Sequence, residues 1–185
     1  MKISIELSDA DLDHFREVMS RARDAARGKD LDAIVDAASQ LLTKVNASAT
    51  SDFIRDRLYT LETLIGMVMD EGWGLVDEDR QRVIEALSYF AEAEDLIPDD
   101  IPGLGFLDDA IMIEIVSDEL QHEIQAYRDF VVYRAAEQAR LGAGAETVER
   151  SDWLETRRQQ LHSRMRRRRR RGGSEGGSRS PFSLF

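Results

Sequence analysis

The segment Asp95-Leu-Ile-Pro-Asp-Asp-Ile-Pro-Gly-Leu-Gly-Phe-Leu-Asp-Asp109 decides how this chain folds. Its fifteen residues contain two of the three prolines of the chain, two glycines and five aspartates. Proline favours extended backbone angles in the residue before it, so Ile97 and Ile101 are predicted to be extended. Pro102-Gly103 suits the two central positions of a type II turn. The segment therefore predicts a rigid corner between two helices.

The sequence on both sides of this corner has helical periodicity, with apolar residues spaced three and four positions apart. We predict an all-α bundle of about five helices, preceded by a short strand-like segment, Lys2 to Leu7, in which apolar and polar residues alternate. The predicted helices run over about 9–28, 30–45, 52–71, 77–91 and 105–141. A weaker polar helix is predicted to follow, over about 146–165.

These features predict three regions along the chain. Residues 1–145 form the helical domain, residues 146–165 form a polar and basic helix, and residues 166–185 form a disordered tail rich in Arg, Gly and Ser.

Composition limits the possible classes of protein. The 185 residues include 42% hydrophobic residues, enough for one core, and no cysteine, which excludes disulfides and cysteine nucleophiles. No apolar run approaches the roughly 20 residues that span a bilayer, so we expect a soluble, cytoplasmic protein, with peripheral attachment to a membrane as an option.

The net charge of -11 is unevenly distributed. Residues 1–156 contain 35 acidic and 15 basic residues, whereas residues 157–185 contain ten arginines and one glutamate.

The corner segment resembles the signature of the YkvA-like family, a group of small bacterial helical domains with no assigned molecular activity. The resemblance covers about residues 80–120, and it implies a helical fold without implying a reaction. The matching motif positions are Asp95, Pro98, Asp99, Pro102, Gly103, Gly105, Asp108 and Asp109.

The acidic corner allows two interpretations. At about 100° per residue, Asp109 is predicted to face the core with Ala110 and Ile113, while Asp108 faces away. The aspartates can accept hydrogen bonds from free backbone N–H groups of the turn and of the helix start. Alternatively, a rigid turn can bring carboxylates together around Mg²⁺ or Ca²⁺. That divalent cation site would use Asp95, Asp99, Asp100 and Asp109, and no other cofactor is expected.

Two further patterns lie in the helix after the corner. Glu119-Leu-Gln-His122 has the Glu-x-x-His spacing of di-iron bundles, but the helical phase turns both side chains outward, which favours a solvated face. Ile111 and Ile115 lie opposite the predicted core face. Either another helix covers them, or they form a surface for a protein partner or for self-association.

The arginine run near the C-terminus is the strongest candidate for binding. Such a run attracts nucleic acid or an anionic membrane surface, and it can also fold back onto the acidic part of its own chain. The predicted polyanion contacts are Arg164, Arg166, Arg167, Arg168, Arg169, Arg170 and Arg171.

No Gly-rich phosphate loop, nucleophile elbow or HExxH motif is present in the sequence. The leading hypothesis is a non-enzymatic helical interaction or scaffold protein whose tail contacts polyanions. The alternative is a divalent-metal-dependent hydrolase or a metal-sensing protein that uses the Asp95–Asp109 turn.

Overall fold

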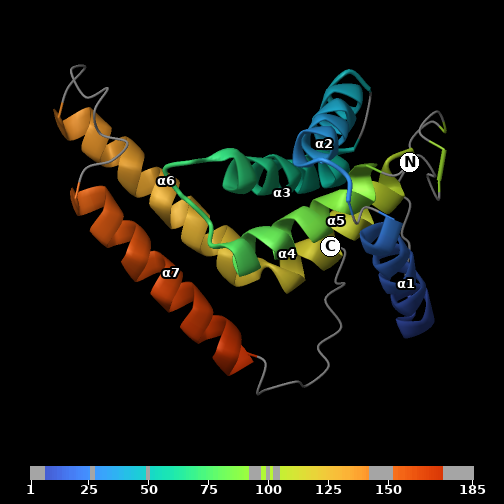
Figure 1. The fold of residues 1–185 in the computed structure, drawn as a ribbon. Coiled ribbons are helices and arrows are strands. Elements are labelled where there is room, and N and C mark those ends of the chain that lie inside the picture. The colour runs from blue at the N-terminus through green and yellow to red at the C-terminus, as the bar shows by residue number, and fades with distance from the viewer. Residues whose placement is uncertain are drawn as a thin grey trace.

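The computed structural model describes residues 7–25, 28–48, 51–91, 97–98, 101, 105–141 and 152–172. Every regular element in these ranges is helical (Figure 1). The elements are α1 (Asp9–Ala25), α2 (Leu31–Asn46), α3 (Asp52–Met69), α4 (Asp77–Leu87), the 3-10 helix η1 (Ser88–Ala91), α5 (Leu107–Glu119), α6 (Gln121–Leu141) and α7 (Asp152–Gly172).

The all-α prediction is confirmed, but the predicted number of helices is wrong. The predicted fifth helix is divided at Leu120, whose angles (φ -109°, ψ 17°) leave the helical range, so it becomes α5 and α6. The predicted polar helix is α7, and it extends to Gly172. The predicted strand-like segment is not supported: Leu7 is not part of a strand, and residues 1–6 lie outside the described ranges.

Local hydrogen bonds at helix starts agree with the sequence. The Ser8 N–H donates to Asp11 Oδ2 (2.8 Å) while the Asp11 N–H donates to Ser8 Oγ (3.2 Å), a reciprocal cap for α1. In α3, Ser51 Oγ accepts from the Ile54 N–H (3.4 Å). Three acidic residues occupy the first turn of α4, where they favour the positive end of the helix dipole.

Helix α3 is central to the bundle, because α2, α4, α5 and α6 all pack against it. Buried side chains from these helices join one hydrophobic core, in which Trp73 has no exposed surface. A hydrogen-bonded turn places Trp73 there. Asp70 accepts from the Trp73 N–H (3.1 Å) and the Tyr127 hydroxyl (3.1 Å), and it receives two bonds from Arg134 (2.9 and 2.7 Å). Burial and the neighbouring Asp70 raise the pKa of Tyr127 to about 12.

The residues Asp108 to Ile113 of α5 are all buried, which decides between the two alternatives that the sequence left open for Ile111 and Ile115. Ile111 and Ile115 are 5% and 7% exposed, so in this chain they offer no open apolar surface to a partner. The structure shows the other alternative: neighbouring parts of the same chain cover Ile111 and Ile115.

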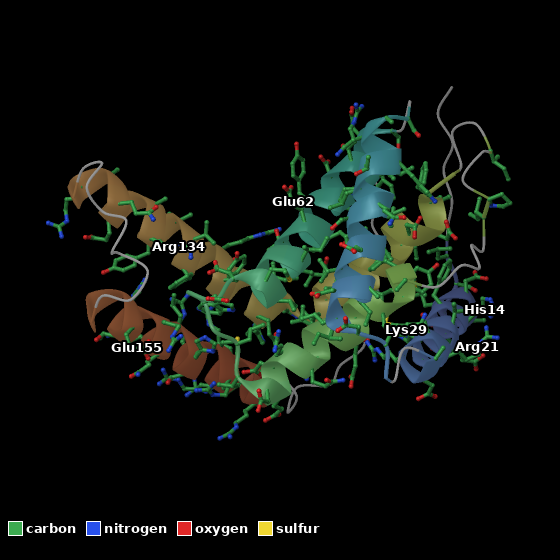
Figure 2. The ribbon with its side chains drawn as sticks, turned by 45° about the horizontal axis from the view of Figure 1, so that its top comes forward. His14, Arg21, Lys29, Glu62, Arg134 and Glu155 are labelled. Atoms are coloured by element: carbon green, nitrogen blue, oxygen red, sulfur yellow. The ribbon has the colours of Figure 1, made fainter. Side chains whose placement is uncertain are left out.

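Helices α6 and α7 lie side by side and antiparallel along one edge of the molecule (Figure 1). Helix α1, which carries His14 and Arg21, lies at the other end, far from Glu155 of α7 (Figure 2).

Among the described helices, none is both long enough and apolar enough to cross a membrane.

Candidate functional site

The structure places only part of the acidic corner. Asp95, Asp99, Asp100, Pro102 and Gly103 lie outside the described residues, whereas Pro98, Gly105, Asp108 and Asp109 lie within them.

Both aspartates at the start of α5 are buried. Asp109 is 7% exposed, in agreement with its predicted inward position. Asp108 is 1% exposed, so the prediction that it faces away from the core is wrong. Its Oδ2 accepts a hydrogen bond from the Ile97 N–H (3.0 Å). This hydrogen bond connects Ile97 of the corner to the start of α5.

No metal centre is visible in the part of the chain that is described, where no three His, Asp or Glu side chains are grouped as ligands. The predicted cation site at Asp95, Asp99, Asp100 and Asp109 stays a prediction, because three of its four residues lie outside that part. The Glu-x-x-His pair is separated: Glu119 pairs with Arg23 (2.7 Å), whereas His122 lies beside α7.

The arginine run is helical up to Gly172, so the predicted disorder of the tail is wrong for Arg166 to Arg171; residues 173–185 lie outside the described ranges. Leu161, Met165 and Arg169 are spaced four residues apart and therefore share one face of α7. Leu161 and Met165 are buried in the core. The same face brings Arg169 into contact with the acidic part of the chain.

Arg169 enters an acidic socket, which we define as Glu78, Asp79 and Glu123. Its Nη1 donates to Asp79 Oδ1 (2.5 Å) and to Glu123 Oε1 (3.0 Å), and its Nη2 donates to Glu78 Oε1 (3.4 Å). Asp79 and Glu123 are 0% and 1% exposed. Two more arginines lie at the edge of the socket, Arg166 at 3.7 Å from Asp79 and Arg82 at 3.6 Å from Glu123.

The charge balance explains this arrangement. A buried carboxylate is costly unless an opposite charge and hydrogen bonds compensate it. Burial alone disfavours a charged Arg169, but the hydrogen bonds to Asp79 and Glu123 outweigh this effect and raise the pKa of Arg169. The socket is thus a place where the basic helix is held against the acidic body.

His162 forms the second contact between α7 and the body. Its ring stacks on Trp73, with 4.2 Å between ring centroids and 23° between planes, and its Nε2 lies 3.2 Å from the Trp73 carbonyl oxygen. Its other ring nitrogen is buried and has no hydrogen-bond partner. Burial lowers the pKa of His162, so the neutral ring, with Nε2 donating to the carbonyl, fits the site.

The outward side of α7 is different in character. Arg167, Arg170 and Arg171 on this side are exposed, and none of them forms an ion pair with a described residue. Arg168 is also exposed and has no such ion pair, but it lies on the side of α7 that faces α6. An open depression on this side is lined by Ser163, Arg166, Arg167, Arg170 and Arg171.

The acidic socket and Trp73 were not predicted as parts of a site from the sequence. One signal was available: the four-residue spacing of Leu161, Met165 and Arg169 predicts that Arg169 faces inward with them. Nothing local identifies its partners, which are 90 residues (Asp79) and 46 residues (Glu123) away in the chain.

The fold and this site define an all-helical domain with a basic helix docked on an acidic body. A family described as "Protein of unknown function (DUF1232)" matches residues 83–115, which run from α4 through the corner into α5. This match supports a domain of unknown function where the sequence resembles the YkvA-like family, and it is compatible with that name without establishing it. The searches of curated proteins and of solved structures gave no match.

Proposed function

We propose that this chain is a non-enzymatic, YkvA-like interaction protein that binds the phosphate backbone of nucleic acid through the outward arginines of α7. The observation that carries the proposal is the open depression lined by Ser163, Arg166, Arg167, Arg170 and Arg171. Arginine is suited to this task because its planar group donates two parallel hydrogen bonds to a phosphate.

The packing of α7 favours nucleic acid over a membrane surface. A helix that anchors to a bilayer inserts an apolar face, but the apolar residues Leu161 and Met165 of α7 are buried against the body. Among the described residues, the depression on the outward side is lined by one serine and four arginines, which can attract phosphates.

The acidic body limits the strength of this binding. Residues 1–156 carry an excess of acidic residues that repels phosphates at long range. At physiological ionic strength the Debye length is about 8 Å, so phosphates close to α7 experience mainly its arginines. We expect moderate affinity with a strong dependence on salt.

The test is to measure, by fluorescence anisotropy over a range of KCl concentrations, binding to single-stranded RNA and to duplex DNA. The variant R167Q/R170Q/R171Q is expected to weaken binding and to reduce the slope of log K against log salt by about one for each arginine in phosphate contact. The matched control is R16Q/R21Q/R55Q, which removes the same charge from exposed positions on α1 and α3.

Equal losses in the two variants would mean that net charge alone governs binding, against the proposal. So would binding to anionic vesicles by a chain that binds neither nucleic acid.

A further inference from the structure

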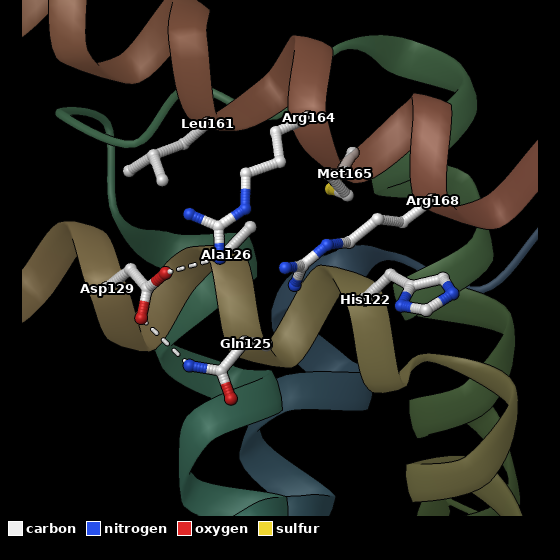
Figure 3. Close-up of a pocket in the computed structure, with 8 residues that line it drawn as sticks. All are labelled: His122, Gln125, Ala126, Asp129, Leu161, Arg164, Met165 and Arg168. Atoms are coloured by element: carbon white, nitrogen blue, oxygen red, sulfur yellow. Dashed lines mark hydrogen bonds and ion pairs between the residues drawn. The ribbon is translucent and has the colours of Figure 1, made fainter.

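A small hollow between α6 and α7 has features of a separate anion site. It is partly open to solvent, and its apolar floor is formed by Ala126, Leu161 and Met165. Its polar lining comes from both helices: His122, Gln125 and Asp129 from α6, and Arg164 and Arg168 from α7 (Figure 3).

Positive charge exceeds negative charge in this hollow. The guanidinium groups of Arg164 and Arg168 both point from α7 into the space above α6 (Figure 3). Asp129 is the one carboxylate among the lining residues, and it already has partners: it lies 3.6 Å from Arg164 and accepts a hydrogen bond from Gln125 Nε2 (2.8 Å). Arg168 forms no ion pair with a described residue. The end of the hollow formed by Arg168 and His122 therefore carries the uncompensated charge of Arg168.

We propose that this hollow binds a phosphomonoester dianion between Arg164 and Arg168, with His122 at the rim. A terminal phosphate carries a charge between about -1.5 and -2 at pH 7 and has three acceptor oxygens, which matches two guanidinium groups and an imidazole. A phosphodiester has one negative charge and two free oxygens, so it uses fewer of these donors.

The size of the hollow sets how the ligand lies. It has room for about one water molecule, so one phosphate oxygen occupies it and the rest of the group stays at the open mouth. Inorganic phosphate and the terminal phosphate of a nucleotide or an oligonucleotide share this chemistry.

This site is distinct from the depression used in the proposed function. Arg168 lines the hollow against α6, whereas Arg167 and Arg170 line the outward depression. A substitution in one site therefore leaves the other intact, and either proposal can fail alone.

The experiment is a titration of the full chain with sodium phosphate, followed by NMR of the histidine rings at constant ionic strength. The chain has three histidines, so the ring signals can be assigned individually. We expect a saturable change at His122 and none at His14, which is exposed on α1 and does not line the hollow.

The variant R168Q is expected to weaken phosphate binding about tenfold or more, because it removes charged hydrogen bonds to the ligand. The matched control R128Q removes the same charge from an exposed position on α6 that lines neither the hollow nor the outward depression, and it is expected to bind phosphate as the wild type does. Circular dichroism checks that both variants keep their helical content. A linear, non-saturating change at His122, or equal affinities in R168Q and R128Q, would overturn the proposal.

A second measurement distinguishes the sources of phosphate. An oligonucleotide with a 5′-phosphate and the same oligonucleotide with a 5′-hydroxyl compete against inorganic phosphate for the His122 signal. Stronger competition by the phosphorylated form, lost in R168Q, identifies a nucleic acid end as the ligand. Equal, weak competition by both forms, with saturable binding of inorganic phosphate, identifies the free ion.

Discussion

Arg169 holds together two carboxylates that the fold has removed from water. Asp79 and Glu123 come from α4 and α6, and Arg169 reaches both from α7. Its neighbour Arg170 has the same chemistry but is exposed and forms no such contact in the described structure. The position on the helix, and not the type of residue, separates the two roles.

We predict that Arg169→Met destabilises the protein by about 3 kcal/mol, because it leaves buried carboxylates without their counter-charge. The measurement is urea unfolding at pH 7. Arg170→Met is the matched control, and its effect is expected to stay within about 0.5 kcal/mol, as for other exposed positions.

The triple variant D79N/E123Q/R169M tests the cause. Removing the two buried carboxylates as well is expected to recover part of the lost stability, since no buried carboxylate is then left without Arg169. A triple variant less stable than R169M would contradict the role of Arg169 as a counter-charge.

At the scale of elements, one of the contacts that hold α7 depends on the protonation of His162. His162 packs on Trp73 as a neutral ring. Burial contributes most to its lowered pKa. Arg158 and Arg166 of α7 also disfavour its protonated form, Asp79 of α4 favours it, and Glu155 of α7 interacts with it as well.

We predict that the docking of α7 weakens in mild acid. The pKa of His162 in the folded chain lies below its ordinary value of 6.5, so the unfolded chain binds more protons between these two values. The free energy of unfolding therefore has its full value above about pH 6.5 and falls as the pH is lowered through this window.

The measurement is urea unfolding at several pH values, with tryptophan fluorescence as the signal. His162→Phe keeps an aromatic ring on Trp73 and is expected to lose this part of the pH dependence, whereas His14→Gln on exposed α1 keeps it. An unchanged pH profile in His162→Phe would show that another group is responsible.

The elements also show which parts of the fold could be predicted from the sequence. The starts of α3 and α4 follow from local signals, the Ser51 cap and the acidic first turn. No Gly or Pro at Leu120 indicates that the predicted helix is divided there into α5 and α6. Tertiary contacts surround it: Arg82 donates to the Glu119 carbonyl (3.3 Å), and the Glu119 carboxylate pairs with Arg23 (2.7 Å). Contacts between distant residues are invisible to a periodicity argument.

The candidate site was predictable to a similar degree. The order of residues alone identifies the arginine run, and the helical phase correctly predicts that Asp109 faces the core. The same phase argument fails for Asp108, because it assumes one buried face whereas every residue from Asp108 to Ile113 is buried. The division of the arginines into socket-facing and outward positions depends on where α7 docks, which only the folded chain defines.

On the scale of the whole molecule, α7 is part of the core as well as the basic surface. Leu161, Met165 and His162 cover apolar groups of the body, including fully buried Trp73. The helix that carries the proposed polyanion-binding arginines is thus attached to the fold by its opposite face.

We predict that a chain ending at residue 151 exposes Trp73. Its tryptophan emission is expected to shift to longer wavelength and its melting temperature to fall, because an apolar surface loses its cover. Trp153 is removed by the truncation, so the signal reports on Trp73 alone. A chain ending at residue 172, which keeps all of α7, is the control. Identical melting temperatures for the two truncated chains would show that α7 adds no stability.

The identity of six consecutive residues has a consequence for how this site tolerates mutation. Deleting any one of Arg166 to Arg171 still leaves an arginine at the fourth position after Met165, the position that enters the socket. Only the end of the run changes, where Gly172 moves up by one place. In-frame loss of a codon within the repeat is therefore silent at the socket, whereas a substitution of Arg169 is not. The arginine repeat therefore preserves the contacts of residue 169 with Asp79 and Glu123 when one arginine of the run is deleted.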